Sequence, residues 1–237
     1  MKNLKLALLI CLLSFVSNSI FAHALWIETQ STGKVGQKQV VKVFYGEYVS
    51  NERDSVGKWY SDVNEFRLWL VGPDQKKTQI AMVPGVNSFE GSFTPALTGA
   101  YTVMVSHEAK ELGGTTKYHF LSSANIVVGK VLPLAAQNTN VLKVHLDDIT
   151  TAKVNKPVQL KSFVQNEAAK GKTVSVFTPS GWSKELRTDD NGVVEFIPLW
   201  AGRYVVELSD MDNTAGQHNG KDFNATWRGA TYSFEVK

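Results

Sequence analysis

The pattern of apolar and polar positions predicts β-strands along almost the whole chain. Apolar residues alternate with polar ones, or fill short runs, and turn-forming sequences such as VGPDQ, VPGVN and TDDNG separate these runs. No convincing amphipathic helix is found. The predicted strands cover residues 25–30, 38–46, 63–71, 77–83, 88–94, 100–107, 116–129, 141–147, 157–164, 173–179, 184–188, 193–197, 203–209 and 227–236.

An internal repeat organises these strands into two copies of one unit. Phe93–Val105 reads FTPALTGAYTVMV and Phe196–Leu208 reads FIPLWAGRYVVEL, so both fit F-x-P-x-x-x-G-x-Y-x-V-x-[VL]. A proline, a glycine and then a tyrosine that opens an alternating strand are typical of the tyrosine corner of immunoglobulin-like sandwiches. We therefore predict an all-β protein with two tandem antiparallel immunoglobulin-like or prealbumin-like β-sandwiches, in which Tyr101 and Tyr204 occupy equivalent corners.

The start of the chain predicts a secretory signal peptide. Lys2 and Lys5 precede the apolar run of residues 6–16, which is too short to span a membrane. Two cleavage sites fit the small-residue rule. Cleavage after Ala22 leaves His23 as the first residue, whereas cleavage after Ala24 discards this histidine. We predict cleavage after Ala22 and a periplasmic or secreted protein.

The resulting domain organisation has four parts. A signal peptide covers residues 1–22, a first sandwich covers 23–130, a linker covers 131–140 and a second sandwich covers 141–237. The formal charge is +3, and it falls to +1 without the two lysines of the signal peptide, so nothing suggests binding to nucleic acid or to an anionic membrane. Cys11 is the only cysteine and lies within the signal peptide, so the mature chain can form no disulfide.

Strand order predicts that several polar residues meet at one end of the first sandwich. His23 precedes the first strand, Glu47 lies in the loop after the second, and His107 and Glu108 end the sixth. In an up-and-down arrangement these positions lie at the same end. The chain has no nucleophile elbow, no phosphate-binding loop and no H-E-x-x-H motif, so we do not expect an enzyme.

These residues favour a metal site. A histidine at a free N-terminus offers an amine and an imidazole to one ion, and one or two further imidazoles would suit Ni(II), Co(II), Cu(II) or Zn(II). We expect His23 and His107 to lie within reach of one ion, with Glu47 and Glu108 in adjoining loops. His218 lies in a long loop of the second sandwich and would join only if that sandwich folds back. We expect a packing role for His119 and a solvated position for His145.

The chain also resembles a bacterial family of secreted proteins that carries a domain of unknown function and is associated with nickel and cobalt uptake. The resemblance lies in AHALWIE directly after the signal peptide, and in YGEY, WYSDV, VSHEAKELGGTTKY and HNGKDFNATWRGATYSFEV. It implies a periplasmic metal-binding accessory protein that serves a membrane metal-uptake system. It also implies that His23 is the first ligand, and it favours His107 and His218 over the other histidines.

Two alternative functions remain open at the level of sequence. The first is a periplasmic copper protein, because most nitrogen sites bind Cu(II) more tightly than Ni(II). The second is a sandwich that binds protein or carbohydrate through exposed aromatic residues, for which the candidates are Trp59, Tyr60, Trp182 and Trp200. A copper oxygenase that uses the N-terminal histidine would need a second imidazole facing the first.

Overall fold

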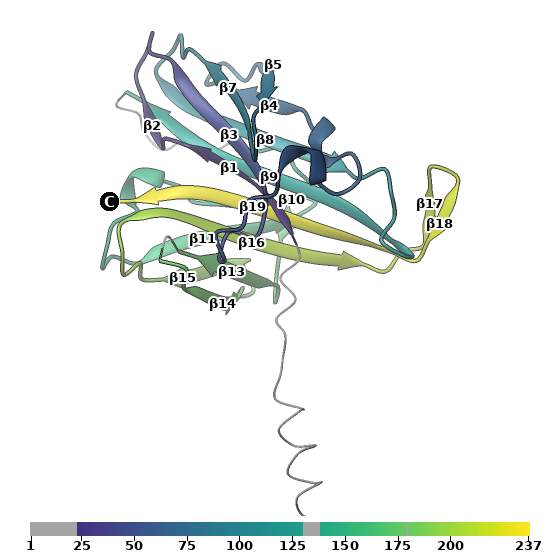
Figure 1. Cartoon of the computed structure of the whole chain (residues 1–237). Helices are drawn as coiled ribbons and strands as arrows, with labels where there is room; N and C mark the ends of the chain where they lie inside the picture. Colours follow the sequence, from purple (N-terminus) through teal and green to yellow (C-terminus); the bar gives the residue numbers. More distant parts are fainter. Residues whose placement is uncertain (1–22, 130–137, 179) are drawn as a thin grey trace, which may run out of the picture.

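The computed structural model describes residues 23–129, 138–178 and 180–237. Regular structure in these residues is almost entirely β-strand (Figure 1), with the single-turn 3₁₀ helices η1 (Val56–Lys58), η2 (Val63–Glu65) and η3 (Ile149–Thr151). No helix in this part of the chain is long and apolar enough to cross a membrane. The predicted signal peptide with its cleavage site, and linker residues 131–137, lie outside the described residues.

The first sandwich has the strand order of an immunoglobulin domain. One sheet has the order β1-β3-β7-β6 and the facing strands have the order β9-β8-β4-β5, which correspond to A-B-E-D and G-F-C-C′. The all-β, immunoglobulin-like prediction is therefore confirmed. The strands are β1 (Ala24–Thr29), β3 (Gln39–Gly46), β4 (Leu68–Val71), β5 (Lys77–Ile80), β6 (Met82–Pro84), β7 (Phe89–Phe93), β8 (Gly99–Glu108) and β9 (Thr116–Val128), with the short β2 (Thr32–Gly33) on β9.

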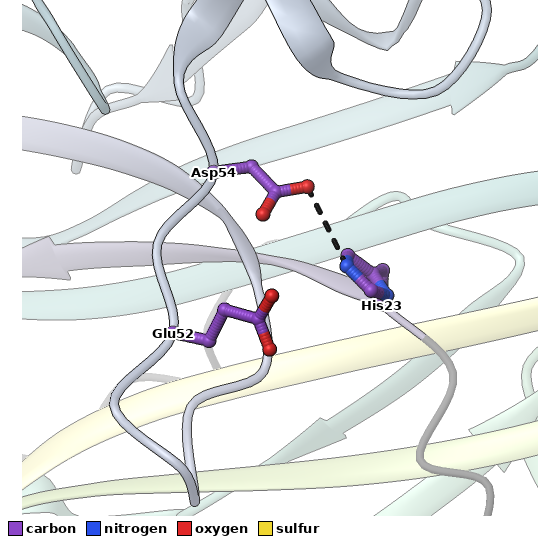
Figure 2. A group of neighbouring side chains, drawn as sticks. All are labelled: His23, Glu52 and Asp54. Carbon is purple, nitrogen blue, oxygen red and sulfur yellow. Dashed lines mark ion pairs between the residues drawn. The ribbon is translucent and has the colours of Figure 1, made fainter.

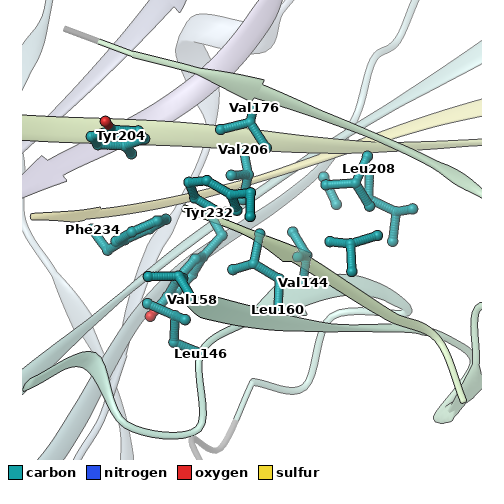
Figure 3. Packing of buried hydrophobic residues seen from close by; sticks show 14 of the residues in the cluster. Val144, Leu146, Val158, Leu160, Val176, Tyr204, Val206, Leu208, Tyr232 and Phe234 are labelled. Carbon is teal, nitrogen blue, oxygen red and sulfur yellow. The ribbon is translucent and has the colours of Figure 1, made fainter. Parts of the chain in front are cut away.

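The second sandwich repeats this plan. Strands β10, β11 and β15 correspond to A-B-E, and β19-β16-β13-β14 correspond to G-F-C-C′. Its core is formed by branched aliphatic and aromatic side chains, among them Val144, Leu160, Val206 and Tyr232 (Figure 3). The strands are β10 (Leu142–His145), β11 (Val158–Val164), β12 (Glu167–Ala168), β13 (Thr173–Phe177), β14 (Ser183–Arg187), β15 (Val193–Phe196), β16 (Gly202–Asp212), β17 (Gly216–His218), β18 (Lys221–Phe223) and β19 (Ala225–Val236).

The two sandwiches are joined through one continuous sheet. The last strand of each, β9 and β19, pair in parallel from Ala225 opposite Thr116 to Ser233 opposite Ala124, which produces a nine-stranded sheet. The two strands run side by side through the middle of the molecule (Figure 1). The second sandwich therefore folds back beside the first. As a result, the last strands of the two sandwiches run in the same direction.

The sheet that contains β1 and the sheet that contains β10 cover opposite faces of this shared sheet. Tyr232 and Phe234 of β19 point into the second core. Thr231 and Ser233, which alternate with them, point the other way and donate hydrogen bonds to the carbonyl oxygens of Leu25 and Ile27 on β1. A strand has two faces, so β19 belongs to both sandwiches at once.

The linker region is packed rather than extended where it is described. Asn138 donates to the Ser123 hydroxyl at 2.9 Å, and the Asn140 amide donates to the carbonyl oxygens of Val105 and Ser122. Both asparagines are buried. The chain therefore enters the second sandwich along the surface of β8 and β9.

The repeated motif forms the same corner in both sandwiches, as predicted. The Tyr101 hydroxyl donates to the Leu97 carbonyl oxygen at 2.9 Å and accepts from the Leu97 amide at 3.0 Å. The Tyr204 hydroxyl makes the same pair of contacts with Trp200, at 3.1 and 3.3 Å. In both cases the tyrosine lies two positions after the glycine that opens the strand.

These corners predict a matched set of stability changes. Tyr101→Phe and Tyr204→Phe should each lower the free energy of unfolding by about 1–2 kcal/mol, because each removes a hydroxyl that bonds two backbone groups. The control is Tyr118→Phe, since the Tyr118 hydroxyl makes no hydrogen bond within the described residues. Urea unfolding followed by circular dichroism measures all three. Equal losses in the three variants would contradict a special role for the corner.

Candidate metal centre

His23 is placed by the pairing of β1 with β3. Ala24 lies opposite Gly46, so His23 stands at the mouth of the loop that follows β3. That loop makes a tight turn in which Glu47 and Glu52 exchange two backbone hydrogen bonds, of 3.2 and 2.9 Å. Asn51 adopts a positive φ of 57° within the turn. The amide of Asp54 then bonds the Tyr45 carbonyl oxygen, so the returning arm of the loop runs beside His23.

Three side chains converge at this point. His23 Nε2 lies 3.4 Å from Asp54 Oδ2. One donor atom each from His23, Asp54 and Glu52 lie within 4.8 Å of one another (Figure 2). The side chains of His23 and Asp54 are 39% and 22% exposed, so the group can be reached from solvent. In the described part of the chain, neither carboxylate forms an ion pair with a lysine or an arginine.

The environment of this group keeps a neighbouring phenol neutral. Tyr45 is buried and its ring lies 5.5 Å from the His23 ring. Burial and the negative charge of Asp54 raise the pKa of Tyr45 well above its ordinary value. Tyr45 therefore packs against His23 as a neutral ring. Both side chains line a cavity of about 260 Å³, whose other rings are Tyr60, Tyr118, Phe120 and Trp227.

The donor set fits a divalent ion of the first transition series. The imidazole nitrogen suits Ni(II), Co(II), Zn(II) and Cu(II), and the two carboxylate oxygens also suit Mn(II), whereas soft Cu(I) prefers sulfur ligands. Two carboxylates facing one imidazole without a basic partner leave an excess of negative charge, which attracts a cation. If His23 were the first residue, its amine would add a second nitrogen to the same ion.

His107 has a different partner. Its Nε2 lies 3.1 Å from Asp62 Oδ1, and the same oxygen accepts a hydrogen bond from the Lys110 amide at 2.8 Å. Burial disfavours the charge on Asp62, but these two bonds outweigh burial and lower the pKa of its carboxyl. His107 thus ties strand β8 to the η2 loop. It is absent from the group that contains His23, although both lie at the end of the sandwich that the strand order predicted.

The two predicted glutamates also lie elsewhere. Glu47 contacts Ser50 and lines a cavity between the two sandwiches. Glu108 binds Lys117 Nζ at 3.1 Å and lies 3.8 Å from His119 Nδ1. Burial disfavours the charge on Glu108, yet Lys117 and His119 lower its pKa overall. In this structure neither glutamate belongs to the group of His23, Asp54 and Glu52.

His218 does reach the first sandwich, because the second sandwich folds back. It ends β17, and its Nε2 lies 2.9 Å from the Ala109 carbonyl oxygen. The β17–β18 hairpin is held there by Asn219, which bonds the Lys110 carbonyl oxygen, and by an ion pair between Lys221 and Glu111 at 2.9 Å. His218 therefore holds the β17–β18 hairpin of the second sandwich against the loop that follows β8 in the first.

The remaining histidines are packed. His119 is buried and lies 2.8 Å from the Ser106 hydroxyl, and burial lowers its pKa to about 4. His145 stacks on Phe163 at 5.6 Å and its side chain is only 12% exposed, so the expectation that it is solvated was wrong. It lies on the face of β10 that turns away from the core residues Leu142 and Val144, and the Phe163 ring covers it there.

The sequence missed Glu52 and Asp54 as candidate ligands. The prediction pointed to the same loop but chose Glu47, at the start of the turn, rather than the residues on its returning arm. The sequence SNERDS could have indicated them. In it a turn-favouring asparagine comes before Glu52 and Asp54, which have one residue between them. Alternate residues of an extended arm point the same way.

Aromatic residues considered for a binding surface divide into two groups. Trp59 is buried in the first core and bonds the Asp54 carbonyl oxygen, so it can present no surface. Trp182 and Trp200 are 43% and 40% exposed, and their rings lie 6.1 Å apart. This pair lies on the second sandwich, whereas the metal group lies on the first.

Comparison with known proteins gives structural likenesses only. No family model and no curated protein matches the sequence. A Salmonella alpha-2-macroglobulin reacted with methylamine is 12% identical, with a TM-score of 0.31, over 90% of this chain and 15% of that one. A two-domain fibronectin type III segment of chicken tenascin is 13% identical, with a TM-score of 0.24, over 86% and 95%. A marsupial T cell receptor is 10% identical, with a TM-score of 0.25, over 88% and 73%.

This chain thus spans about 15% of the macroglobulin's length. The fold assignment rests on the strand order of the two sandwiches.

Proposed function

We propose that this protein binds a divalent transition-metal ion through His23, Asp54 and Glu52, and that it serves outside the cytoplasm as an accessory protein that presents nickel or cobalt to an uptake system. The observation that carries the proposal is the convergence, within 4.8 Å, of one imidazole and two carboxylates that form no ion pair with a described lysine or arginine. The resemblance to secreted proteins associated with nickel and cobalt uptake supports the choice of metal. A copper protein remains the alternative, since the same donors bind Cu(II).

The aromatic cavity beside the group supports this proposal. Its rings exclude water from one side of His23, and a lower local polarity strengthens the attraction between a cation and the carboxylates. Tyr45 fixes the ring of His23 by packing, and the backbone bond from Asp54 to Tyr45 fixes the carboxylate. A site held by backbone pairing on β1 and β3 needs little rearrangement to accept an ion.

The test is a titration of the metal-free protein that begins at His23 with Ni(II), Co(II) and Cu(II), measured by isothermal calorimetry. His23→Ala, Asp54→Asn and Glu52→Gln should each weaken binding at least 10-fold, which is the lower end of the effect of losing even an outer partner of a ligand. The matched control is His145→Ala, because His145 also lies near a carboxylate, 3.7 Å from Asp147, but on the other sandwich.

A second protein that retains Ala22 separates the role of the amine. It should bind more weakly than the protein that begins at His23, because an amide nitrogen is a poor ligand. If His23→Ala and Asp54→Asn bind all three ions as the parent does, the metal site is elsewhere or absent. The binding-module alternative, based on Trp182 and Trp200, would then become the leading function.

A further inference from the structure

A second cavity, of about 300 Å³, lies where the two sandwiches meet, and we call it the interdomain cavity. Its wall on the first sandwich is made by β1 and the loop after β3, including Trp26, Glu47 and Tyr48. Its floor is the face of β14, β13, β16 and β19 that turns away from the second core. His23, Asp54 and Glu52 do not line it, so it is separate from the metal group.

A row of polar side chains crosses this floor. Ser175 lies opposite both Glu185 and Glu207, and Glu207 lies opposite Thr231. The neighbouring row on the same face contains Phe177 and Val205, which are buried against the first sandwich. The apolar row is therefore covered by the domain contact, while the polar row is left open to the cavity.

The cavity carries negative charge without a balancing cation. Glu47, Glu185 and Glu207 all line it, and among the described residues no lysine, arginine or histidine does. None of the three glutamates forms an ion pair within the described residues. Glu207 accepts one hydrogen bond, from the neutral Ser209 hydroxyl at 3.1 Å. The atoms around Glu207 remove it from water, and this burial raises its pKa to about 7.

Aromatic rings complete the lining. Trp26, Tyr48, Phe177 and Trp227 all contribute to the wall or the floor, and of these Tyr48 and Trp227 keep part of their surface exposed. Organic cations bind against aromatic faces because the ring quadrupole attracts positive charge. A volume of about 300 Å³ is at the lower end for small-molecule sites. The cavity is thus much larger than a bare metal ion and suits a small organic molecule.

We propose that the interdomain cavity binds a small organic cation, a protonated amine on a short apolar body, with its ammonium group at Glu207 and its apolar part against the aromatic wall. The bound ammonium group would be the positively charged partner that the Glu207 carboxylate does not have in the free protein. Because the cavity is built from both sandwiches, the ligand would contact both at once.

The experiment uses the full mature chain with a metal chelator present, and compares n-pentylamine with its neutral analogue 1-pentanol by isothermal calorimetry. The amine should bind, and the alcohol should bind at least 10-fold more weakly. Glu207→Gln, which keeps the shape of the side chain, should weaken binding of n-pentylamine at least 10-fold. Glu195→Gln is the matched control, since Glu195 is an exposed strand residue that bonds Gln159 on the other face of the second sandwich.

A further variant separates this proposal from the metal function. His23→Ala should bind n-pentylamine as the parent does, so loss of the metal site and loss of the amine site are distinguishable. Circular dichroism confirms that each variant is folded. The proposal is overturned if n-pentylamine gives no binding at about 10 mM, if 1-pentanol binds equally well, or if Glu207→Gln binds the amine like the parent.

Discussion

Trp26→Ala is expected to lower the free energy of unfolding by about 3–5 kcal/mol, the range typical of truncating a buried tryptophan. Trp26 is fully buried and stacks on Phe44 at 5.5 Å. It packs with Phe177 and Val205 of the second sandwich, so its removal leaves a void in the contact between the two sandwiches. Urea unfolding followed by circular dichroism measures the loss.

The same measurement tests whether the two sandwiches unfold together. The parent should show one transition, because β19 contributes to both sandwiches. Trp200→Ala is the control, since Trp200 is 40% exposed and should cost no more than about 1 kcal/mol. Two separated transitions in the parent, or an equal loss in the two variants, would contradict this view of the domain contact.

Glu207→Gln is expected to stabilise the protein by about 3 kcal/mol at pH 8 and to leave it unchanged at pH 4. Burial raises the pKa of Glu207 from 4.5 to about 7. Below pH 4.5 the side chain is neutral in both the folded and the unfolded state, so it contributes no difference. Between pH 4.5 and 7 only the unfolded state ionises, and the folded state loses stability by about 1.4 kcal/mol for each unit of pKa shift.

The comparison must be made between variant and parent at each pH. His119 has a pKa lowered to about 4, so its effect on stability runs in the opposite direction, with stability lost as the pH falls from about 6.5 to 4. The parent can therefore show a flat profile in which the two effects cancel. Thermal or urea unfolding of both proteins from pH 4 to 8 measures the difference. A constant difference across this range would mean that Glu207 is not desolvated.

The strands and the corners could be predicted because their signals are local. The alternation of side chains gave the strand positions, and the repeated proline, glycine and tyrosine gave the equivalence of Tyr101 and Tyr204. The predicted strand over residues 77–83 is divided into β5 and β6, which belong to different sheets. A continuous pattern does not reveal that a chain crosses from one sheet to the other.

The shared sheet could not be predicted, because its signal resembles that of a solvent-facing strand. In β19, Thr231 and Ser233 alternate with Tyr232 and Phe234, which indicates one buried and one exposed face. Instead, the hydroxyls bond the backbone of β1 within a second protein interior. Serine and threonine satisfy backbone carbonyls as well as they satisfy water, so period-two alternation cannot distinguish the two environments.

The candidate site was predicted in position but not in composition. Strand order placed His23, His107 and the loop after β3 at one end, and the structure has them there. Which carboxylates meet His23 depends on the turn from Glu47 to Glu52, whose backbone bonds bring Asp54 alongside. Such a turn reverses the direction of the chain over a few residues, and composition alone does not fix where it reverses.

The parallel pairing of β9 with β19 has a consequence for how the protein is made. The partners are separated by 109 positions, since Thr116 pairs with Ala225. At ribosomal rates of roughly 5–20 residues per second, β9 would wait about 5–20 s for its neighbour. During that time a long strand with an unpaired edge is open to pairing with other chains. The edge of β9 therefore has to stay apart from other chains until β19 is available to pair with it.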